Sequence, residues 1–293
     1  MTGANGSVAR SFIGRAARAH RVEAVARSAG APEENCRLQV ADLVDYEKWQ
    51  ASASSASHIV HLAASRSDSK EKDLYQDIPI AGRLLDCWKR GQFIFAGSQI
   101  VYSQGSDGPL DENSPCGPYN WYGASKLAIE HMIRVQFARN RRQPGFEGGY
   151  VILRIPPVAH SAPGKNQFLE PLVRSVTMGL NFCFDCPKEQ AGRYGSSWIG
   201  IDDLSRALFH ATGEIASGIY NVDSGYVRTV DVLEMMIGKL GSRSRILYNC
   251  KGMGIDIPLT STRLNTDKIR SAGFEPRDTL EGIVERALAG KRQ

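Results

Sequence analysis

Short apolar runs alternate with longer stretches of mixed polarity over the first 160 residues of the chain. The apolar runs predict buried strands, and the stretches between them predict helices. A regular alternation of strand and helix is typical of parallel βαβ units, so the sequence predicts a doubly wound parallel α/β sheet. Strands are expected at Val22–Ala26, Leu38–Ala41, Ile59–Ala63, Phe93–Ala96 and Val151–Ile155, and helices near Val8–Arg18, Leu74–Arg90 and Ser125–Arg139.

The pattern changes after about residue 160, where shorter pieces rich in Gly and Asp replace the alternation. This part is expected to form a smaller α/β lobe that binds the substrate. At 293 residues, with 42% hydrophobic and 23% charged residues, the chain is long enough to bury a large core and to form two domains.

Charge and hydropathy argue against nucleic acid and membrane as partners. The net charge of +5 is spread along the chain, apart from the basic run 139–142, which is typical of a solvated helix end. No apolar run approaches the roughly 20 residues of a membrane span, and no leader segment is recognisable.

Cysteine usage points to a reducing compartment. Six cysteines in a chain of this length are too sparse for a disulfide framework, so a cytoplasmic protein is expected. Cys183 and Cys186 form a Cys-x-x-Cys, but no second pair and no nearby His completes a zinc site. We therefore expect no metal ion.

Tyr122 and Lys126 are the strongest candidates for chemistry, because they lie at positions i and i+4 of a segment expected to be helical. Side chains at that spacing share a helix face, which brings the Lys126 ammonium near the Tyr122 phenol. Lowering the pKa of a phenol from about 10 to about 7 requires roughly 4 kcal/mol of preferential stabilisation of the phenolate. A nearby ammonium, together with an oxidised nicotinamide, is a source of that stabilisation.

Hydride-transfer chemistry uses such a phenol. Tyr122 would exchange a proton with a substrate oxygen while a hydride moves on the neighbouring carbon. Ser98, at the end of the strand expected at Phe93–Ala96, would hydrogen-bond the same oxygen.

A glycine loop at Thr2–Ala9 supplies the second motif. It reads Thr-Gly-x-x-Gly-x-x-Ala, where Gly3 and Gly6 let backbone amides approach a pyrophosphate at a helix N-terminus. Ala9 stands where a third glycine is common, a mild departure because that position mainly serves helix packing.

The chain resembles the extended short-chain dehydrogenases/reductases, in the group called NAD-dependent epimerase/dehydratases, over nearly its whole length. Besides the glycine loop and the Ser, Tyr and Lys set, the resemblance rests on 40–43, 58–64, 150–157, 198–204 and 218–222. It implies a Rossmann-like dinucleotide-binding domain at 1–160 and a lobe at 161–293 that mainly binds substrate, with Trp198–Ala211 and Gly218–Val222 returning to the first domain. It also implies a homodimer formed through the helices at Leu74–Arg90 and Ser125–Arg139.

The resemblance assigns residues to each ligand. Ser98, Tyr122 and Lys126 are the expected catalytic residues, and Gln99 and Arg193 are expected to bind the substrate, a nucleotide-activated sugar. Arg193 is a candidate for a phosphate contact because its planar guanidinium matches paired oxygens, although a plain surface arginine is an equal alternative. The expected cofactor contacts are Gly3, Asn5, Gly6, Ser7, Val8, Arg27, Asp42, Leu43, Leu62, Ala63, Ala64, Tyr122, Lys126 and Ile155.

The first strand of the sheet is the most serious departure. In a doubly wound fold the glycine loop follows a buried strand, yet only Met1 and Thr2 precede Gly3 here. Without that strand, the edges of its neighbours would be unpaired. Either the recorded start lies downstream of a natural one, which we favour, or another segment fills the position.

Arg27 bears on the choice between NADP and NAD. An acid at the end of the second strand would bind the ribose hydroxyls and repel a 2'-phosphate, but this strand ends in Arg27 and Ser28. The residues therefore favour NADP, and NAD stays open because an arginine that stacks on adenine tolerates both.

The residues after Ser98 reduce the number of possible reaction types. Dehydratases of the resembled group carry an Asp-Glu pair there, but this chain has Gln99 and Ile100, which argues against dehydration. A 4-epimerase or a 4-ketoreductase remains, and the alternative is a sensor or scaffold that binds a dinucleotide without chemistry. Asp77 falls where that group often has an Asn that braces the active-site helix.

Overall fold

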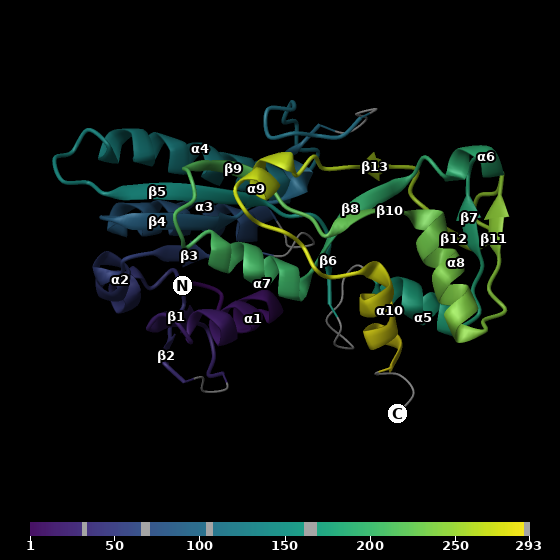
Figure 1. The fold of residues 1–293 in the computed structure, drawn as a ribbon, viewed down its shortest axis with the longest axis horizontal. Coiled ribbons are helices and arrows are strands. Elements are labelled where there is room, and N and C mark those ends of the chain that lie inside the picture. The colour runs from purple at the N-terminus through teal and green to yellow at the C-terminus, as the bar shows by residue number, and fades with distance from the viewer. Residues whose placement is uncertain (31–33, 66–70, 104–107, 161–168, 290–293) are drawn as a thin grey trace.

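A computed structural model of the chain describes residues 1–30, 34–65, 71–103, 108–160 and 169–289. The elements form two lobes, with the larger lobe nearer the N-terminus and the smaller one at the other end of the long axis (Figure 1). The fold is α/β with a Rossmann-like parallel sheet, as the sequence predicts.

The parallel sheet of the larger lobe has central strands that are apolar on both faces. In β4, Phe93 and Phe95 pack into the core on one face, whereas Ile94 packs on the other. Burial on both faces is expected for parallel strands that helices cover from two sides. The strands are β1 (Val22–Ala26), which pairs with β2 (Cys36–Val40), and the set β3 (Ile59–His61), β4 (Gly91–Ala96), β5 (Gly148–Arg154) and β9 (Gly218–Asn221), in that order.

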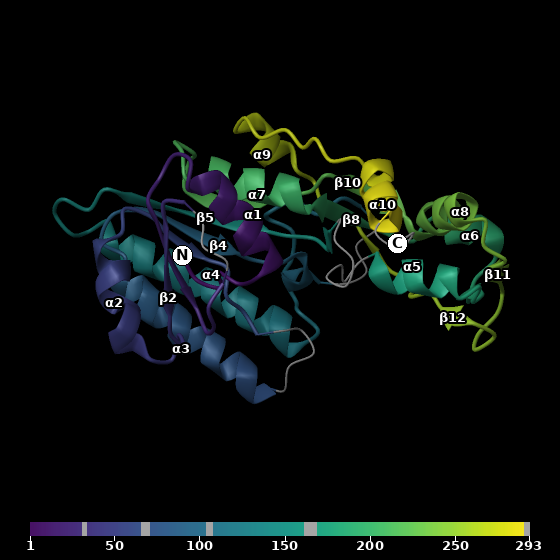
Figure 2. The same cartoon turned by 90° about the horizontal axis from the view of Figure 1, so that it is seen from below.

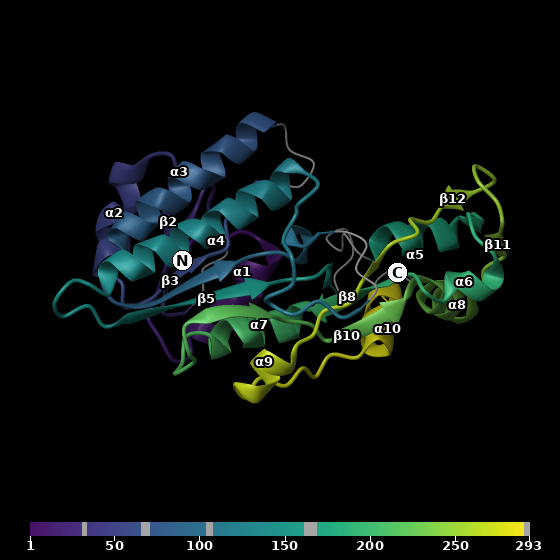
Figure 3. The same ribbon diagram turned by 90° about the horizontal axis from the view of Figure 1, so that it is seen from above.

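Helices cover both faces of this sheet (Figures 2 and 3). One face is covered by α1 (Ser7–Ala16) and α7 (Ile201–His210), and the other by α2 (Tyr46–Ser55), α3 (Glu71–Cys87) and α4 (Trp121–Asn140). None of the helices in the described ranges combines the length and the apolar character needed to cross a bilayer.

The bounds of two helices depend on packing and on a cap. Helix α2 ends at Ser55, within a run of small residues, and Trp49, 1% exposed, anchors it in the core. In α4 the helix begins before Ser125, because the Asn120 side chain caps it by accepting a hydrogen bond from Gly123 N at 2.8 Å.

Met1 and Thr2 occupy the place of the first strand. Thr2 forms parallel bridges with both Val25 and His61, so the sheet is continuous from β1 to β3 through this one residue. The Thr2 amide donates to Val60 O at 3.0 Å, and the Val25 amide donates to Met1 O at 2.9 Å. A cavity of about 310 Å³ lies beside this bridge, between β1 and β3 and the helices that cover them.

The smaller lobe has its own core and two small sheets. Phe182, Phe184 and Trp198 are buried in that core. One sheet contains β6 (Val158–Ala159), β8 (Gly195–Gly200), β10 (Gly225–Arg228) and β13 (Ser261–Thr262), and the other contains β7 (Phe182–Phe184), β11 (Ile246–Tyr248) and β12 (Ile255–Asp256). The remaining helices are the 3-10 turn η1 (Gln99–Val101), α5 (Glu170–Thr177), α6 (Lys188–Ala191), α8 (Thr229–Leu240), α9 (Asp267–Ser271) and α10 (Leu280–Ala289).

Gly3 and Gly14 allow a matched test of the glycine loop. Gly3 has φ +75°, and a Cβ there would lie 2.8 Å from Ala63 N, so Gly3→Ala is expected to destabilise the fold by about 2 kcal/mol. Gly14 lies inside α1 with open space around it, so Gly14→Ala is expected to stabilise by about 0.5 to 1 kcal/mol. Urea unfolding of both variants measures the difference, and equal midpoints would contradict the strain at Gly3.

Candidate active site

A cleft of about 2400 Å³ opens where the parallel strands end. One wall comes from the glycine loop and from the residues that follow β3, β4 and β5, and the other comes from α5, β8, β10 and the segment around β13. Ligands of doubly wound sheets bind at this edge, beyond the carboxyl ends of the strands. The cleft exceeds the 300 to 1,000 Å³ of a typical small-ligand pocket, so it has room for two extended ligands.

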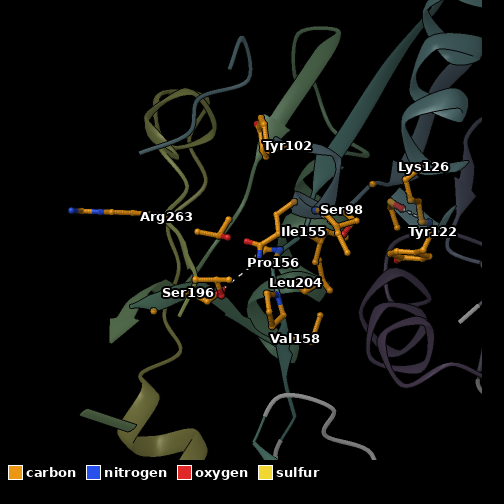
Figure 4. A pocket seen from close by; sticks show the side chains of 18 of the residues that line it. Ser98, Tyr102, Tyr122, Lys126, Ile155, Pro156, Val158, Ser196, Leu204 and Arg263 are labelled. Carbon is orange, nitrogen blue, oxygen red and sulfur yellow. Dashed lines mark hydrogen bonds between the residues drawn. The ribbon is translucent and has the colours of Figure 1, made fainter. Parts of the chain in front are cut away.

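Ser98, Tyr122 and Lys126 lie together in the wall of the cleft (Figure 4). Tyr122 and Lys126 come from the first turns of α4, and Ser98 follows β4. The Lys126 ammonium donates a hydrogen bond to Ala96 O at 2.8 Å, and it lies 4.7 Å from the centre of the Phe95 ring and 5.6 Å from that of Tyr122. The structure thus brings the three expected catalytic side chains together.

Burial and neighbouring charges shift the pKa values of both Lys126 and Tyr122. Burial lowers the pKa of Lys126 from 10.5 to about 8, and the nearby carboxylates of Asp77 and Glu130 oppose that change. Burial and then Asp77 raise the pKa of Tyr122 above its ordinary value of 10, while the Ser98 hydroxyl acts in the opposite direction. The expectation that Lys126 and an oxidised nicotinamide together make the phenol acidic concerns the protein with its cofactor bound, and it stays a prediction.

A buried ion pair supports the same helix, and the sequence reasoning missed it. Glu130 and Arg154 are 1% and 3% exposed, and the guanidinium of Arg154 donates to both carboxylate oxygens of Glu130, at 2.8 and 3.2 Å. Glu130 is four residues beyond Lys126 on one helix face, and Arg154 interrupts an apolar strand. These two signals could have revealed the pair.

The glycine loop forms a cradle suited to a dinucleotide. Gly6 precedes α1 and no side chain caps that helix, so the first N–H groups are available to an anion at the positive end of the helix dipole. Asn5, Gly6, Ser7, Val8, Leu62, Ala64 and Ile155 all line the cleft, and Gly3 packs against Ala63 just behind it.

Besides Gly3 and Ala63, three further expected cofactor residues lie outside the lining of the cleft. Arg27 is exposed after β1, and Asp42 is exposed after β2, where its carboxylate accepts a hydrogen bond from Val44 N at 3.2 Å. Leu43 packs against the core under α2 and α3. Contacts of these residues with a cofactor stay a prediction.

The opposite wall carries the expected substrate residues and further ones. Arg193 lines the cleft, and Gln99 Nε2 donates to Ser196 Oγ of β8 across it, at 3.4 Å. Arg174 and Arg263 also line this wall, but they come from segments without a motif, and tertiary packing alone brings them here. Among the described residues, no group of three or more His, Cys, Asp or Glu side chains could hold a metal ion.

His61 is a buried neutral base below the site. It is 1% exposed, and its Nδ1 lies 2.8 Å from Thr2 Oγ1. The centre of its ring lies 5.6 Å from the centre of the Phe95 ring. Burial, followed by the charge of Lys126, lowers the pKa of His61 from 6.5 to about 3. His61 therefore carries no charge at neutral pH.

The model of the NAD dependent epimerase/dehydratase family matches residues 1–223 of the chain. An uncharacterized protein of Sinorhizobium fredii is 22% identical over 261 residues, which are 87% of this chain and 61% of that protein. An N-acetyl-α-D-glucosaminyl-diphospho-ditrans,octacis-undecaprenol 4-epimerase of Escherichia coli O157:H7 is 33% identical over 102 residues, which are 33% of this chain and 30% of that one. The chain thus spans less than two thirds of the length of these curated relatives.

Solved structures share the fold over almost the whole chain. MoeE5 in complex with UDP-glucose and NAD is 22% identical, with a TM-score of 0.78, and the match covers 99% of this chain and 97% of that one. A UDP-N-acetylglucosamine 4-epimerase from Bacillus cereus is 18% identical, with a TM-score of 0.78 and coverage of 99% and 98%. The UDP-glucose 4-epimerase of Thermus thermophilus, complexed with NAD, is 20% identical, with a TM-score of 0.78 and coverage of 99% and 97%.

His61 makes stability depend on pH. Between pH 6.5 and about 3 the unfolded chain binds a proton at this residue and the folded protein does not, so acidification lowers the free energy of unfolding by up to about 1.4 kcal/mol per pH unit. His61→Asn should remove this part of the slope, whereas His131→Asn, at an exposed position of α4, should keep it. Urea unfolding at a series of pH values from about 7 to about 5 measures both slopes, and an unchanged slope in His61→Asn would sink the assignment.

Proposed function

The chain belongs to the NAD dependent epimerase/dehydratase family, enzymes of the extended short-chain dehydrogenase/reductase type, and we propose that it acts by hydride transfer on a nucleotide-activated sugar. The observation that carries this proposal is the meeting of Ser98, Tyr122 and Lys126 in one cleft beside the glycine loop. The cleft is also large enough to hold a dinucleotide and a nucleotide sugar together.

Tyr122 is the proton-transfer residue of the proposed mechanism. A nicotinamide supplies the hydride acceptor when it is bound. The Tyr122 phenolate takes the proton of the sugar hydroxyl, the Ser98 hydroxyl donates a hydrogen bond to the same oxygen, and the Lys126 ammonium stabilises the phenolate. In the reductive step the neutral phenol returns the proton to the sugar oxygen.

The two residues directly after Ser98 are Gln99 and Ile100, so neither of these positions carries an acidic side chain. Neither side chain can take or give the proton that elimination of water across a carbon–carbon bond requires. We therefore propose a 4-epimerase or a 4-ketoreductase rather than a dehydratase. The 4-epimerase named for Escherichia coli and the 4-epimerase structures of the same fold favour the first of these.

Positive charge in the cleft supports a diphosphate-bearing substrate. Four arginines line it against one acid, Glu170, among the described residues. Arg193 and Arg174 lie on the wall opposite the glycine loop, so we propose that they hold the diphosphate of the sugar nucleotide through paired N–H donors. UDP-glucose, with which the similar MoeE5 forms a complex, has this chemistry.

The charge near the end of β1 favours NADP. The side chain of Asn5 donates to Ser28 O at 2.8 Å and to Ser28 Oγ at 2.9 Å, which ties the turn after β1 to the glycine loop. Arg10 donates to Asn5 O at 3.1 Å, so it and Arg27 flank this turn. We propose that the two arginines and the Ser28 hydroxyl bind the 2'-phosphate of NADP, with NAD as the alternative cofactor.

We also propose a homodimer formed through α3 and α4. On α4, Val135 is 61% exposed, and an apolar side chain at this position suits an interface between two subunits.

Tyr122→Phe tests the function. Turnover of UDP-activated sugars with NAD or NADP should fall by a factor on the order of 10² to 10⁴, because the proton-transfer group is lost while the ring is kept. Tyr248→Phe, in β11 and outside the cleft lining, should keep full turnover. Undiminished turnover in Tyr122→Phe would reject the mechanism, and dinucleotide binding without turnover of any keto sugar would favour a non-catalytic sensor.

Arg27→Asp tests the cofactor proposal. The carboxylate would repel a 2'-phosphate, so NADPH should bind about tenfold more weakly while NADH binds as well or better. Arg21→Asp makes the same charge change just before the other end of β1 and should leave the NADPH to NADH ratio unaltered. Calorimetric titration measures both ratios, and equal effects of the two substitutions would reject a direct phosphate contact.

A further inference from the structure

Asn221 is a fully buried amide at the end of β9 that the proposed mechanism does not use. Its Oδ1 accepts a hydrogen bond from the Tyr102 hydroxyl at 2.7 Å. Its Nδ2 donates to two backbone carbonyls, Leu110 O at 2.8 Å and Asn265 O at 3.1 Å. Both N–H groups and the oxygen of the side chain are thus paired, as burial requires, because an unpaired polar group in the interior is costly.

The two carbonyls belong to segments from different lobes. Leu110 lies between η1 and α4 of the larger lobe, and Asn265 follows β13 of the smaller lobe. The two segments run side by side, because the Leu110 amide donates to Arg263 O at 2.7 Å and the Asn265 amide donates to Leu110 O at 2.8 Å. Leu110 and Leu264 form a parallel bridge. We call this pairing of Leu110 with Arg263, Leu264 and Asn265 the lobe junction.

Apolar packing and hydrogen bonds act differently on the lobe junction. Leu110, Leu264 and Tyr102 belong to one small apolar cluster. Burial of apolar surface is not directional, so this cluster holds the two segments together without fixing how they are oriented. Hydrogen bonds are directional, and the amide of Asn221 bonds to both segments and to the Tyr102 hydroxyl. Asn221 therefore fixes the position of one segment relative to the other.

Residues on both sides of the lobe junction line the cleft. Tyr102 and Leu110 contribute from the larger lobe, and residues 258–263 contribute from the smaller one. In Figure 4, Tyr102 and Arg263 lie well away from Tyr122. The lobe junction thus shapes a part of the cleft that lies apart from the catalytic phenol.

The run 258–263 carries groups that suit a sugar nucleotide. Ser261 Oγ lies 3.0 Å from the hydroxyl oxygen of Tyr226, and the guanidinium of Arg263 lies 5.6 Å from the centre of the Tyr226 ring. Hydroxyl groups donate to and accept from the hydroxyls of a sugar, and a guanidinium pairs with phosphate oxygens. Because this run leads directly into the lobe junction, the hydrogen bonds of Asn221 determine where these groups stand.

We propose that Asn221 is a positioning residue for the substrate. By joining Leu110 to Asn265, it fixes how far apart the two lobes stand at the end of the cleft that holds the sugar nucleotide. This proposal rests on the proposed function and deepens it, because it separates substrate binding from cofactor binding and from proton transfer. Other bonds hold the catalytic side, such as the one from the Lys126 ammonium to Ala96 O, so loss of the Asn221 side chain affects mainly the substrate side.

Asn221→Ala tests the proposal by removing all three side-chain hydrogen bonds. The Kd of UDP-glucose, measured by calorimetric titration, should rise about tenfold, because the groups of 258–263 are no longer held in one position. The Kd of NADPH should change by less than about twofold, because other elements form its site. In turnover, the KM for the sugar nucleotide should rise by the same factor as its Kd, while kcat stays within about twofold.

Asn140→Ala is the matched control. Asn140 is 3% exposed, and its amide donates to Trp88 O at 3.2 Å and accepts from Gln136 Nε2 at 2.8 Å, at the end of α4 and outside the cleft lining. Urea unfolding should show a loss of stability in both variants, but Asn140→Ala should leave the Kd of UDP-glucose unchanged. An equal rise of that Kd in the two variants would overturn the proposal, because a general loss of stability would then explain it.

Tyr102→Phe keeps the proposal falsifiable where Asn221→Ala does not fold. It removes one of the three bonds and keeps the ring, so UDP-glucose should bind about threefold more weakly. Tyr220→Phe is its control, because it removes a hydroxyl that donates to Ala216 O at 2.7 Å, on the same strand but outside the cleft lining, and binding should not change. Where Asn221→Ala folds, adding Tyr102→Phe to it should weaken binding no further.

Failure of this proposal differs from failure of the proposed function. Unchanged UDP-glucose binding in Asn221→Ala or in Tyr102→Phe would reject the positioning role and leave the proposed mechanism in place. Full turnover in Tyr122→Phe would reject the mechanism, whereas selective weakening of UDP-glucose in Asn221→Ala would still support the role of Asn221. A wild-type protein that does not bind UDP-glucose would reject both.

Discussion

Burial of charge along one face of α4 is the constraint on which the site depends. Tyr122, Lys126 and Glu130 follow one another at intervals of four residues, and the last two are almost completely buried. A charge at such a position is costly unless it is paired or hydrogen-bonded, and each has its partner, Ala96 O for Lys126 and Arg154 for Glu130. Because both partners belong to β4 and β5, these bonds fix α4 against the end of the sheet and aim Tyr122 into the cleft.

The sheet positions could be read from the sequence because their physical cause is local. Central strands such as β4 and β5 are continuous apolar runs, and parallel strands buried on both faces leave that pattern without any knowledge of their neighbours. The start of helix α2 was not predicted, because its small residues carry no clear period and Trp49 stabilises it only through contacts with distant elements. Strand and helix ends shifted by a few residues where a cap such as Asn120 decides them.

The part of the active site that depends on local spacing could also be predicted from the sequence. Spacing along α4 placed Tyr122 and Lys126 on one face, and the strand end placed Ser98 near them. The raised pKa of the Tyr122 phenol could not be read from the sequence, because its causes, burial and then the charge of Asp77 on α3, arise only in the folded protein. The arginines of the substrate-facing wall could not be predicted for a similar reason, since Arg174 and Arg263 are far apart in the chain and line one cleft only in the folded protein.

The bridge at Thr2 has a consequence for cooperativity. The strand pair β1 and β2 reaches the rest of the sheet through the backbone bonds around a single residue, with a cavity beside it. Such a unit can open locally at a smaller cost than the whole lobe, so its amides should exchange with solvent ahead of those in β4 and β5. A ligand that contacts both the glycine loop and the residues after β3 would link the β1–β2 pair to the rest of the sheet. Binding of that ligand would therefore make the local opening rarer, and more so the tighter the ligand binds.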